Sequence, residues 1–544
     1  MKVDDDLRLK SPTPEKSDCF CRWCKCMAMG KDKLNNYKMP ENTKCCWCLL
    51  SFAFVLGLIC LATGITMLFV LDPFVRSQIE KKVVLSNESD LYEVWQDIPV
   101  PIYMEFWLYN VSNIQEVLNG KPPKVTQMGP YTYKERREKY DIIWNPNGTV
   151  TYKQNRTFTF LPNLSVGNET DFVTTINPLI PVLAFGLKTW SYWTRAIIVK
   201  GLSYWPVELF FTRSVKELLW GYDDPVLEYL KGVWPDRFDT SRIGYFIRKN
   251  NTHDGVYTVH TGENNISDVG KVSVHKGKSE LDIWTTKYAN MINGTDGTAN
   301  SPFNFDANHS SVYVSDICRS IKGVYMKDVN VKGIQLRRFG GDRQDMENAT
   351  ANPDNYGFCT PKGTPKEKCL PSGLLNSTMC QEPVDGFYLP AIFSFPHFLH
   401  ADPKVQKSVI GLDPNVEEHQ TTIDMEPWTG LVLQAAKRLQ INIFVEKVDF
   451  LPQTQNVSTL FFPILWLNES SVTNDKYANM LKDQLFSVKS LAENARVIAI
   501  ITGGVLVLVS VILLVLYRRY ITKFDYIQAA TEFIDKRVPV YLDV

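Results

Sequence analysis

The stretch CCWCLLSFAFVLGLICLATGITMLFVL, residues 45–71, decides the architecture of this 544-residue chain. Its 27 residues carry no charge, and neither do the 21 residues of a second apolar stretch at 497–517. A helix rises about 1.5 Å per residue, so each stretch can cross a hydrocarbon layer about 30 Å thick. The first begins too late and is too long for a cleaved signal peptide. We therefore predict transmembrane helices at 45–71 and 497–517.

Fourteen N-x-Ser/Thr glycosylation sequences all lie between these two stretches. Asn-linked glycans are added on the lumenal side of the secretory pathway, so this distribution indicates topology. It predicts cytoplasmic tails at 1–44 and 518–544 and one glycosylated exterior domain at 72–496. Flanking lysines and arginines support this orientation only weakly, because several also lie just outside the second helix. The predicted glycosylation sites are Asn87, Asn110, Asn147, Asn155, Asn163, Asn168, Asn250, Asn265, Asn293, Asn308, Asn348, Asn376, Asn456 and Asn468.

The cysteines fall into two groups with different chemistry. The exterior domain contains four, Cys318, Cys359, Cys369 and Cys380. An even number in an oxidising compartment predicts two disulfides, for which the count alone leaves three pairings. The other eight lie in or before the first apolar stretch. Among these, Cys45, Cys46 and Cys48 border the membrane and are predicted to be palmitoylated. The run CFCRWCKC at 19–26 favours acylation over zinc, because four such close thiolates suit a zinc geometry poorly.

The composition and the motifs argue against several classes of function. A formal net charge of zero argues against nucleic acid as a partner. The sequence has no G-x-S-x-G motif and no P-loop. His397 and His400 are three positions apart, but no neighbouring ligand completes a metal set. We therefore predict that the chain is not an enzyme and needs no cofactor or metal.

The pattern of the exterior domain is mostly that of β-strands. Large and polar residues alternate at 152–160, 256–259 and 312–314, with turn signals such as Asn147-Gly148 between them. Residues 172–222 differ, because they lack this alternation and are rich in Leu, Trp and Phe. We predict a cluster of short helices there, joined at Pro178, Pro181 and Pro206. Two interpretations of its aromatic residues stay open: a helical sub-core, or an exposed surface that meets a ligand or partner.

Several separated motifs together resemble one known family. In order along the chain, they include LYNVSN at 108–113, GPYTY at 129–133, ELLWGY at 217–222, NPDNYGFCT at 352–360 and DMEPWTG at 424–430. The chain resembles the class B scavenger receptors, which include platelet glycoprotein IV and the type 2 lysosomal integral membrane protein. The resemblance implies an antiparallel β-barrel core, an apical helical bundle at about 172–222, and an internal apolar tunnel.

The resemblance also assigns individual residues. It implies disulfides between Cys318 and Cys380 and between Cys359 and Cys369. Some relatives have a third bridge, whose two positions correspond here to Ala289 and Gly357. Relatives that bind anionic ligands carry lysines just before the ELLWGY motif, where this chain has Tyr204-Trp205-Pro206. An aromatic contact is therefore expected at the apex, and the predicted ligand-binding residues are Trp190, Trp193, Tyr204 and Trp205.

The function implied by this resemblance is a cell-surface receptor that binds lipids or lipoproteins and takes up or transfers lipid through the tunnel. Two alternatives are a trafficking receptor for a lysosomal hydrolase and an adhesion or debris receptor without lipid transfer. We expect the plasma membrane as the location, with endosomes or lysosomes second. At the C-terminus, Tyr541 and Val544 fit a Tyr-x-x-apolar sorting signal. The same four-residue end also fits a PDZ ligand, with Leu542 and Val544 as the apolar pair, and the third alternative is a tail that no partner recognises. A homo-oligomer is left open, since Ala53-x-x-x-Gly57 and Gly503-Gly504 are common helix-packing spacings.

Overall fold

The computed structural model describes residues 43–205, 207–233, 235, 240–359, 366–381 and 388–535. The chain forms two compact units. One combines Met1–Val75 with Asp483–Val544, and the other is Arg76–Lys482. The predicted sorting residues Tyr541 and Val544, and the cysteine run at 19–26, lie outside the described residues.

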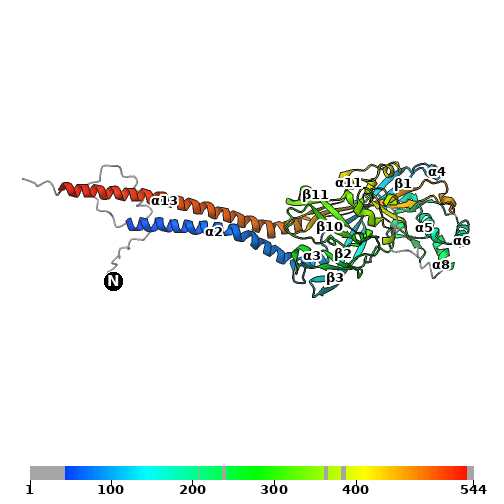
Figure 1. Ribbon diagram of the computed structural model, residues 1–544, viewed down its shortest axis with the longest axis horizontal. Coiled ribbons are helices and arrows are strands. Elements are labelled where there is room, and N and C mark those ends of the chain that lie inside the picture. The colour runs from blue at the N-terminus through cyan, green and yellow to red at the C-terminus, as the bar shows by residue number, and fades with distance from the viewer. Residues whose placement is uncertain are drawn as a thin grey trace, which may run out of the picture. The chain divides into compact units, whose positions relative to one another are not determined.

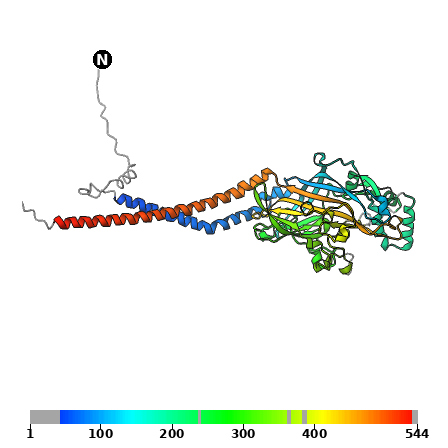
Figure 2. The same ribbon diagram turned by 90° about the horizontal axis from the view of Figure 1, so that it is seen from above.

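Two long helices make up most of the described part of the first unit, and they contain the two predicted membrane spans. They are α2 (Thr43–Val83) and α13 (Val488–Asp535). Leu49–Val83 and Asp475–Ile534 are long and apolar enough to cross a membrane. Figure 2 shows α2 in blue beside α13 in orange and red. Glycines allow the close approach, because a Cβ added to Gly503 would lie 2.6 Å from the backbone nitrogen of Leu61 and 2.8 Å from the carbonyl oxygen of Gly57.

The second unit is built on one large antiparallel sheet of 13 strands. Its order is β10-β11-β12-β15-β16-β17-β1-β2-β3-β8-β9, with β14 also pairing β16 and β13 pairing β14. Thr295 forms isolated bridges to Lys271, beside β9, and to Val312 in β10, so the two edges nearly meet. The mostly-β prediction with a barrel core is confirmed. The strands are β1 (Ile102–Val111), β2 (Val125–Asn145), β3 (Thr149–Phe160), β8 (Val256–His260), β9 (Val272–His275), β10 (His309–Val314), β11 (Arg319–Val331), β12 (Ile334–Gly341), β13 (Leu375–Asn376), β14 (Ala391–Ser394), β15 (Thr422–Met425), β16 (Val432–Val445) and β17 (Leu460–Val472).

Local sequence explains how these strands begin and turn. The β2–β3 hairpin reverses at Asn147-Gly148, where Gly148 adopts a φ of 71° that residues with a side chain disfavour.

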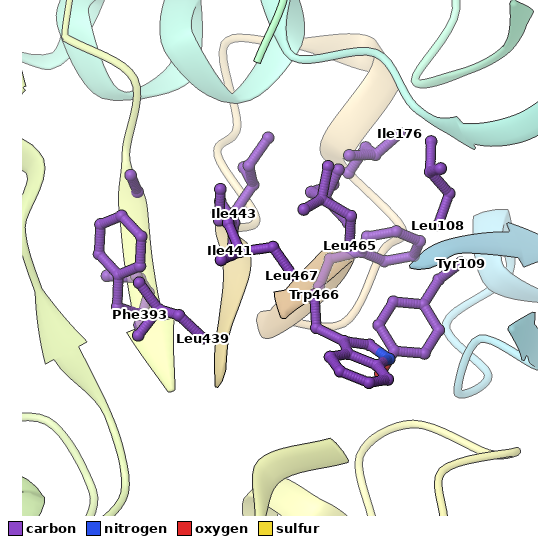
Figure 3. Close-up of a cluster of buried hydrophobic side chains, with 14 of the residues drawn as sticks. Leu108, Tyr109, Ile176, Phe393, Leu439, Ile441, Ile443, Leu465, Trp466 and Leu467 are labelled. Carbon is purple, nitrogen blue, oxygen red and sulfur yellow. The ribbon is translucent and has the colours of Figure 1, made fainter. Parts of the chain in front are cut away.

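Neighbouring strands supply a common core, in which Leu108 of β1, Ile443 of β16 and Leu465 of β17 are at most 1% exposed. Figure 3 shows these residues pointing into one cluster from separate strands. Each such side chain contributes about 2 kcal/mol on burial.

Several helices of this unit gather at one end. Figure 1 shows α5, α6 and α8 together, with α3 and β10 at the opposite end of the domain. The helices are α3 (Asp90–Gln96), α4 (Ile114–Leu118), α5 (Leu179–Gly186), α6 (Tyr192–Leu202), α7 (Val215–Trp220), α8 (Pro225–Val233), α9 (Lys287–Asn290), α10 (Pro403–Gln406), α11 (Val416–His419) and α12 (Asp475–Leu481). The helical cluster predicted at 172–222 is therefore present.

Two details of that cluster differ from the prediction. It also contains strands, since β4 (Phe172–Ile176) at its start pairs with β5 (Phe210–Ser214), which directly precedes α7. The β-branched run Val-Thr-Thr-Ile at 173–176 is the sequence signal for β4. Pro181 lies inside the first turn of α5 rather than between helices, where its missing N–H leaves no hydrogen bond unmade. Two-residue strands β6 (Tyr222–Asp223) and β7 (Arg242–Ile243) pair just beyond α7.

Candidate functional site

The helical cluster has its own apolar core, separate from that of the barrel. Buried side chains of α5, α6 and α8 meet two residues that follow β16. The members are Leu179, Leu183, Ala184, Leu187, Ile198, Leu202, Val226, Leu227, Leu230, Val448 and Leu451. This core holds the helices in place independently of any ligand, which bears out the sub-core interpretation of the region.

The outer side of α6 is also apolar, but it is exposed. Tyr192, Trp193, Ile197 and Tyr204 are 67%, 76%, 65% and 76% exposed, and we call these four residues the α6 face. Trp193 and Ile197 are one helical turn apart, while Ile198 on the opposite side is buried in the sub-core. Ser191 caps the start of the helix, and its side chain accepts a hydrogen bond from the backbone N–H of Thr194. A grouped apolar surface of this kind is typical of an interaction site.

The four aromatic residues predicted at the apex divide between these two roles. Trp193 and Tyr204 belong to the exposed α6 face. Trp190 and Trp205 are half-buried and pack against the sub-core instead. The ring of Trp205 lies 5.9 Å from that of Tyr229 in α8. Helical periodicity alone could not separate these roles, because Tyr204 and Trp205 follow the last turn of α6.

Cations border the α6 face, but they are engaged with neighbouring groups. Lys200 lies 5.6 Å from the centre of the Tyr204 ring, and Arg195 lies 4.8 Å from that of Phe450. Lys188 pairs with Glu446. The surface is therefore aromatic in its middle and basic at its rim, an arrangement also found on helices that lie at lipid–water interfaces.

A cavity of about 330 Å³ lies inside the barrel. Strands from all around the sheet line it, and most of the wall is apolar. Representative apolar lining residues are Ile102, Val312, Phe339, Ile423, Leu433 and Leu439. A small apolar molecule fits a space of this kind, since ligand cavities begin at roughly 300 Å³. A continuous tunnel from this cavity to the α6 face stays a prediction.

One side of the cavity is charged, and we call Arg137, Arg156, Asp316, Lys437 and Glu469 the charged wall. Its opposite charges are paired: Arg137 with Glu469, Lys437 with Asp316 at 3.0 Å, and Lys437 with Glu469 at 3.5 Å. Burial raises the pKa of Glu469, but the charges of Arg137 and Lys437 outweigh it and lower that pKa to about 2. The pKa of Asp316 is likewise held well below its usual value, since Lys437 and Arg156 outweigh burial. The carboxylates therefore stay ionised throughout the physiological pH range.

Sequence reasoning missed the charged wall. Its signal is present in β2, where Glu135, Arg137 and Lys139 alternate along the strand and so share one side of the sheet. Such a run is normally read as a solvated face, and only the neighbouring strands show that it is largely buried. Glu135 and Lys139 are 2% and 1% exposed.

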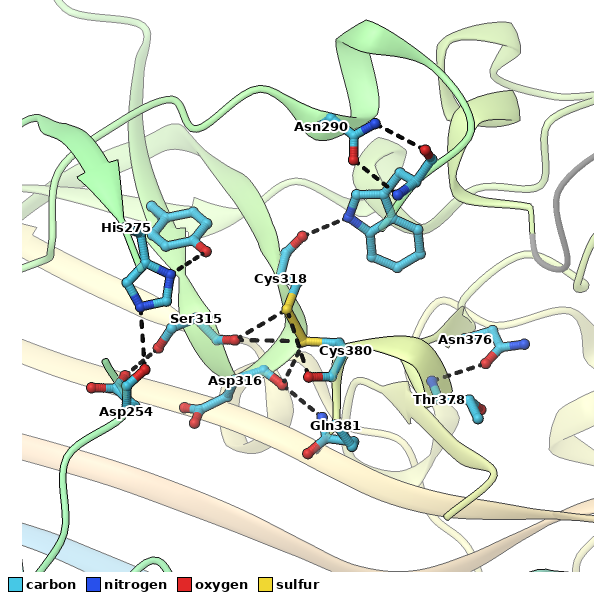
Figure 4. The surroundings of a disulfide bond; sticks show 12 residues. Asp254, His275, Asn290, Ser315, Asp316, Cys318, Asn376, Thr378, Cys380 and Gln381 are labelled. Carbon is cyan, nitrogen blue, oxygen red and sulfur yellow. Dashed lines mark hydrogen bonds between the residues drawn. A yellow bond between two sulfur atoms is a disulfide. The ribbon is translucent and has the colours of Figure 1, made fainter. Parts of the chain in front are cut away.

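Both disulfides implied by the resemblance are present. Cys318 bonds to Cys380 and Cys359 bonds to Cys369. Figure 4 shows the first beside Asp316 of the charged wall. The backbone carbonyl of Asp316 accepts a hydrogen bond from Gln381 at 2.9 Å, so the bridge helps to position that wall. Ala289 and Gly357, which correspond to the third bridge of some relatives, are neighbours here as the resemblance implies. A Cβ added to Gly357 would lie 2.7 Å from the Cβ of Ala289.

The remaining predicted sites are placed but not tested. Nine of the fourteen glycosylation asparagines are exposed, and the other five are half-buried. Among these five, Asn348 donates its side-chain amide to the carbonyl of Leu370, and Asn468 donates to Glu105. A glycan on either nitrogen replaces one of its two hydrogens, so a single N–H remains to donate such a bond. Cys45, Cys46 and Cys48 lie in the first turns of α2, and their side chains are outside the described part of the chain.

The two histidines considered as metal ligands have other neighbours. His400 contacts Gln420 at 2.9 Å, whereas His397 stacks on the distant His419 at 4.2 Å between ring centres. Among the described residues, no group of three or more His, Cys, Asp or Glu could hold a metal ion.

Comparison with known proteins agrees with this architecture. The sequence model of the CD36 family matches residues 55–514. Human lysosome membrane protein 2 (Homo sapiens) is 38% identical over 444 residues, covering 80% of this chain and 89% of that protein. Scavenger receptor class B member 1 of the rat (Rattus norvegicus) is 32% identical over 475 residues, covering 87% of this chain and 91% of that protein. The bovine (Bos taurus) form of the same receptor is 30% identical over 458 residues, covering 84% of this chain and 87% of that protein.

Proposed function

This chain belongs to the CD36 family, and on that premise we propose that it is a cell-surface receptor that docks lipid-bearing particles on its α6 face and takes their lipid into the barrel cavity. The cavity carries the proposal. Barrels of modest size are normally filled by side chains, and a mostly apolar space of about 330 Å³ left among the strands is large enough for a small lipid or part of a longer one. An apolar ligand gains about 25 cal/mol for each Å² that it removes from water.

The α6 face supplies the complementary step. A lipid surface accepts exposed Trp and Tyr rings, which prefer the boundary between headgroups and acyl chains. The basic rim, with Lys200 beside Tyr204, favours anionic headgroups at that boundary. The sub-core keeps the helices folded when the face is free, so docking needs no folding step.

We propose the plasma membrane as the principal location and endosomes or lysosomes as the second. The names of the relatives support both, since one is a scavenger receptor and one a lysosome membrane protein. Both tails are proposed to be cytoplasmic, which leaves Tyr541 and Val544 accessible to an adaptor or a PDZ domain.

Filling the cavity tests the transfer step. Ala435 and Val312 line the cavity, and we expect Ala435→Phe and Val312→Phe each to lower uptake of a fluorescent lipid from particles while binding of the particles in the cold is unchanged. Ala351→Phe is the matched control, because Ala351 is exposed and lies outside the cavity lining. Overpacking costs about 1–3 kcal/mol, so thermal melting must first show that each variant is folded. Wild-type uptake by both folded variants would refute lipid transfer and leave the adhesion or debris receptor.

The second candidate is a trafficking receptor for a lysosomal hydrolase. The α6 face supports this candidate as well, because exposed aromatic residues above a well-packed sub-core are also suited to binding a protein partner. In that case, cavity filling leaves partner capture intact, while removal of the α6 face abolishes it.

A further inference from the structure

Two buried histidines stack on each other beside the barrel. His397 lies in the turn η9 (Pro396–Phe398), with a φ of 55°, and His419 ends α11. Their ring centres are 4.2 Å apart and their planes differ by 12°. Only 5% and 3% of the two residues are exposed. Nothing in the proposed docking or transfer steps uses this pair.

The hydrogen bonds of the two rings require both to be neutral. The backbone N–H of Asp413 donates to Nδ1 of His397, and that of Asn415 donates to Nδ1 of His419, each at 2.9 Å. A backbone N–H can only donate, so each Nδ1 must carry a lone pair. On the other side of the His397 ring, Nε2 lies 2.7 Å from Oε1 of Gln127, to which it donates.

Protonation of this pair is costly for three reasons. It places an N–H opposite a backbone N–H at each Nδ1, it buries positive charge, and it brings two like charges to 4.2 Å. Burial, followed by the charge of His419, lowers the pKa of His397 to about 4. Burial also lowers the pKa of His419. Since these folded-state pKa values lie below the ordinary value near 6.5, the closed arrangement is stable above about pH 6.5 and loses stability as the pH falls toward 4.

The surrounding charges do not offset this cost. Arg438 of β16 further lowers the pKa of His419, while the carboxylates of Glu418 and Asp413 raise it by less than burial lowers it. Tyr109 of β1 has its ring 5.7 Å from that of His397, and burial raises its pKa so that it stays neutral. The remaining ring packed against the pair, that of Trp466 in β17, carries no charge.

The histidines are directly connected to the wall of the cavity. Phe395 and Thr421 both line it, and they lie two residues from His397 and His419, respectively. Gln420, which lies between His419 and Thr421, donates its side-chain amide to the carbonyl of Gly341 at 2.6 Å. The Gly341 N–H in turn donates to the carbonyl of Thr421 at 3.0 Å. Gly341 also lines the cavity. The end of the segment 411–420 is therefore hydrogen-bonded to that wall.

We propose that the His397–His419 stack is an acid-sensitive latch, which holds residues 411–420 on the barrel at neutral pH and opens more readily, loosening the cavity wall, when the receptor reaches an acidic compartment. The role of this release in lipid discharge rests on the proposed function, whereas the latch itself does not. At pH 5 the charged wall remains intact because the pKa of Glu469 is about 2. His275, another buried histidine, lies in β9 and contacts Tyr313 and the carbonyl of Asp254, so its response would be seen elsewhere.

Hydrogen–deuterium exchange of the full chain in phosphatidylcholine nanodiscs at pH 7.4 and 5.0 tests the latch in the absence of any lipid-bearing particle. The pKa of His397 is about 4 in the closed arrangement, against about 6.5 for a free ring. After correction for intrinsic exchange rates, this difference predicts that opening of 411–420 is about 30-fold more frequent at pH 5.0 than at neutral pH. The double variant His397→Asn/His419→Asn should abolish this increase. Asn Oδ1 takes the position of Nδ1 and accepts the same backbone N–H, but it does not titrate. His309→Asn, at an exposed position, should leave the increase unchanged.

Unchanged protection of 411–420 between the two pH values in the wild-type chain would overturn the latch, even if the variants fail to fold. A pH response confined to 272–275 would do the same and point to His275. An increase that survives in the folded double variant would also refute it. A working latch in a protein that never takes up lipid would instead refute the proposed function alone.

Discussion

Removing the rings of Trp193 and Tyr204 should weaken particle docking severely without unfolding the domain. Both residues are 76% exposed, and neither belongs to the sub-core. The double variant Trp193→Ala/Tyr204→Ala therefore deletes apolar surface that only a ligand can cover. Substitutions at such exposed positions normally change the free energy of unfolding by less than about 0.5 kcal/mol.

The magnitude follows from the exposed area. An aromatic side chain presents roughly 200 Å², so three-quarters exposure leaves about 150 Å² on each ring. At about 25 cal/mol per Å², full burial of both rings in a lipid surface gives about 8 kcal/mol. Insertion to half that depth gives about 4 kcal/mol, which corresponds to an affinity loss on the order of 1,000-fold.

The assay is binding of the purified receptor in nanodiscs to lipoprotein particles and, separately, to protein-free lipid emulsions. Tyr288→Ala is the matched control, since Tyr288 in α9 is 59% exposed but lies outside the α6 face. Equal losses on particles and emulsions identify lipid as the docked surface. Loss on particles alone identifies a protein component of the particle as the docked surface. Affinity within a few-fold of wild type for both would refute the role assigned to the α6 face.

Two further substitutions test the packing. Gly503→Leu should separate α2 from α13, because its Cβ meets backbone atoms, and should lower the melting temperature in detergent by an amount corresponding to about 1–3 kcal/mol. Gly504→Leu is the control, because a Cβ at Gly504 has no heavy atom within 4 Å, and it should leave the melting temperature unchanged. Equal effects of the two substitutions would contradict the close packing of the helices at Gly503. The double variant Ala289→Cys/Gly357→Cys should form a third disulfide, which would raise the free energy of unfolding by up to about 2–4 kcal/mol. The strain of moving Thr286 and of spreading the two Cβ atoms reduces this gain. Mass spectrometry that finds both thiols free would refute the prediction.

Several features could be read from the sequence because they depend on local composition. A membrane helix satisfies its own backbone hydrogen bonds, so an uncharged run such as residues 45–71 predicts a span without knowledge of its neighbours. The α7 helix is similar: Ser214 and Glu217 form a reciprocal capping box, and Val215, Leu218 and Leu219 are all buried on one side, as their spacing indicates.

Other features were decided only by the tertiary structure. Trp193 and Trp205 are equally aromatic, yet one is exposed and the other packs on the sub-core, because α5 and α8 cover only one side of α6. The stacked histidines are 22 positions apart, and their pairing needs η9 and α11 to meet beside the barrel. The physical reason is that a sequence pattern specifies which residues share a face of an element, whereas burial, charge pairing and proton affinity depend on what the rest of the chain places against that face.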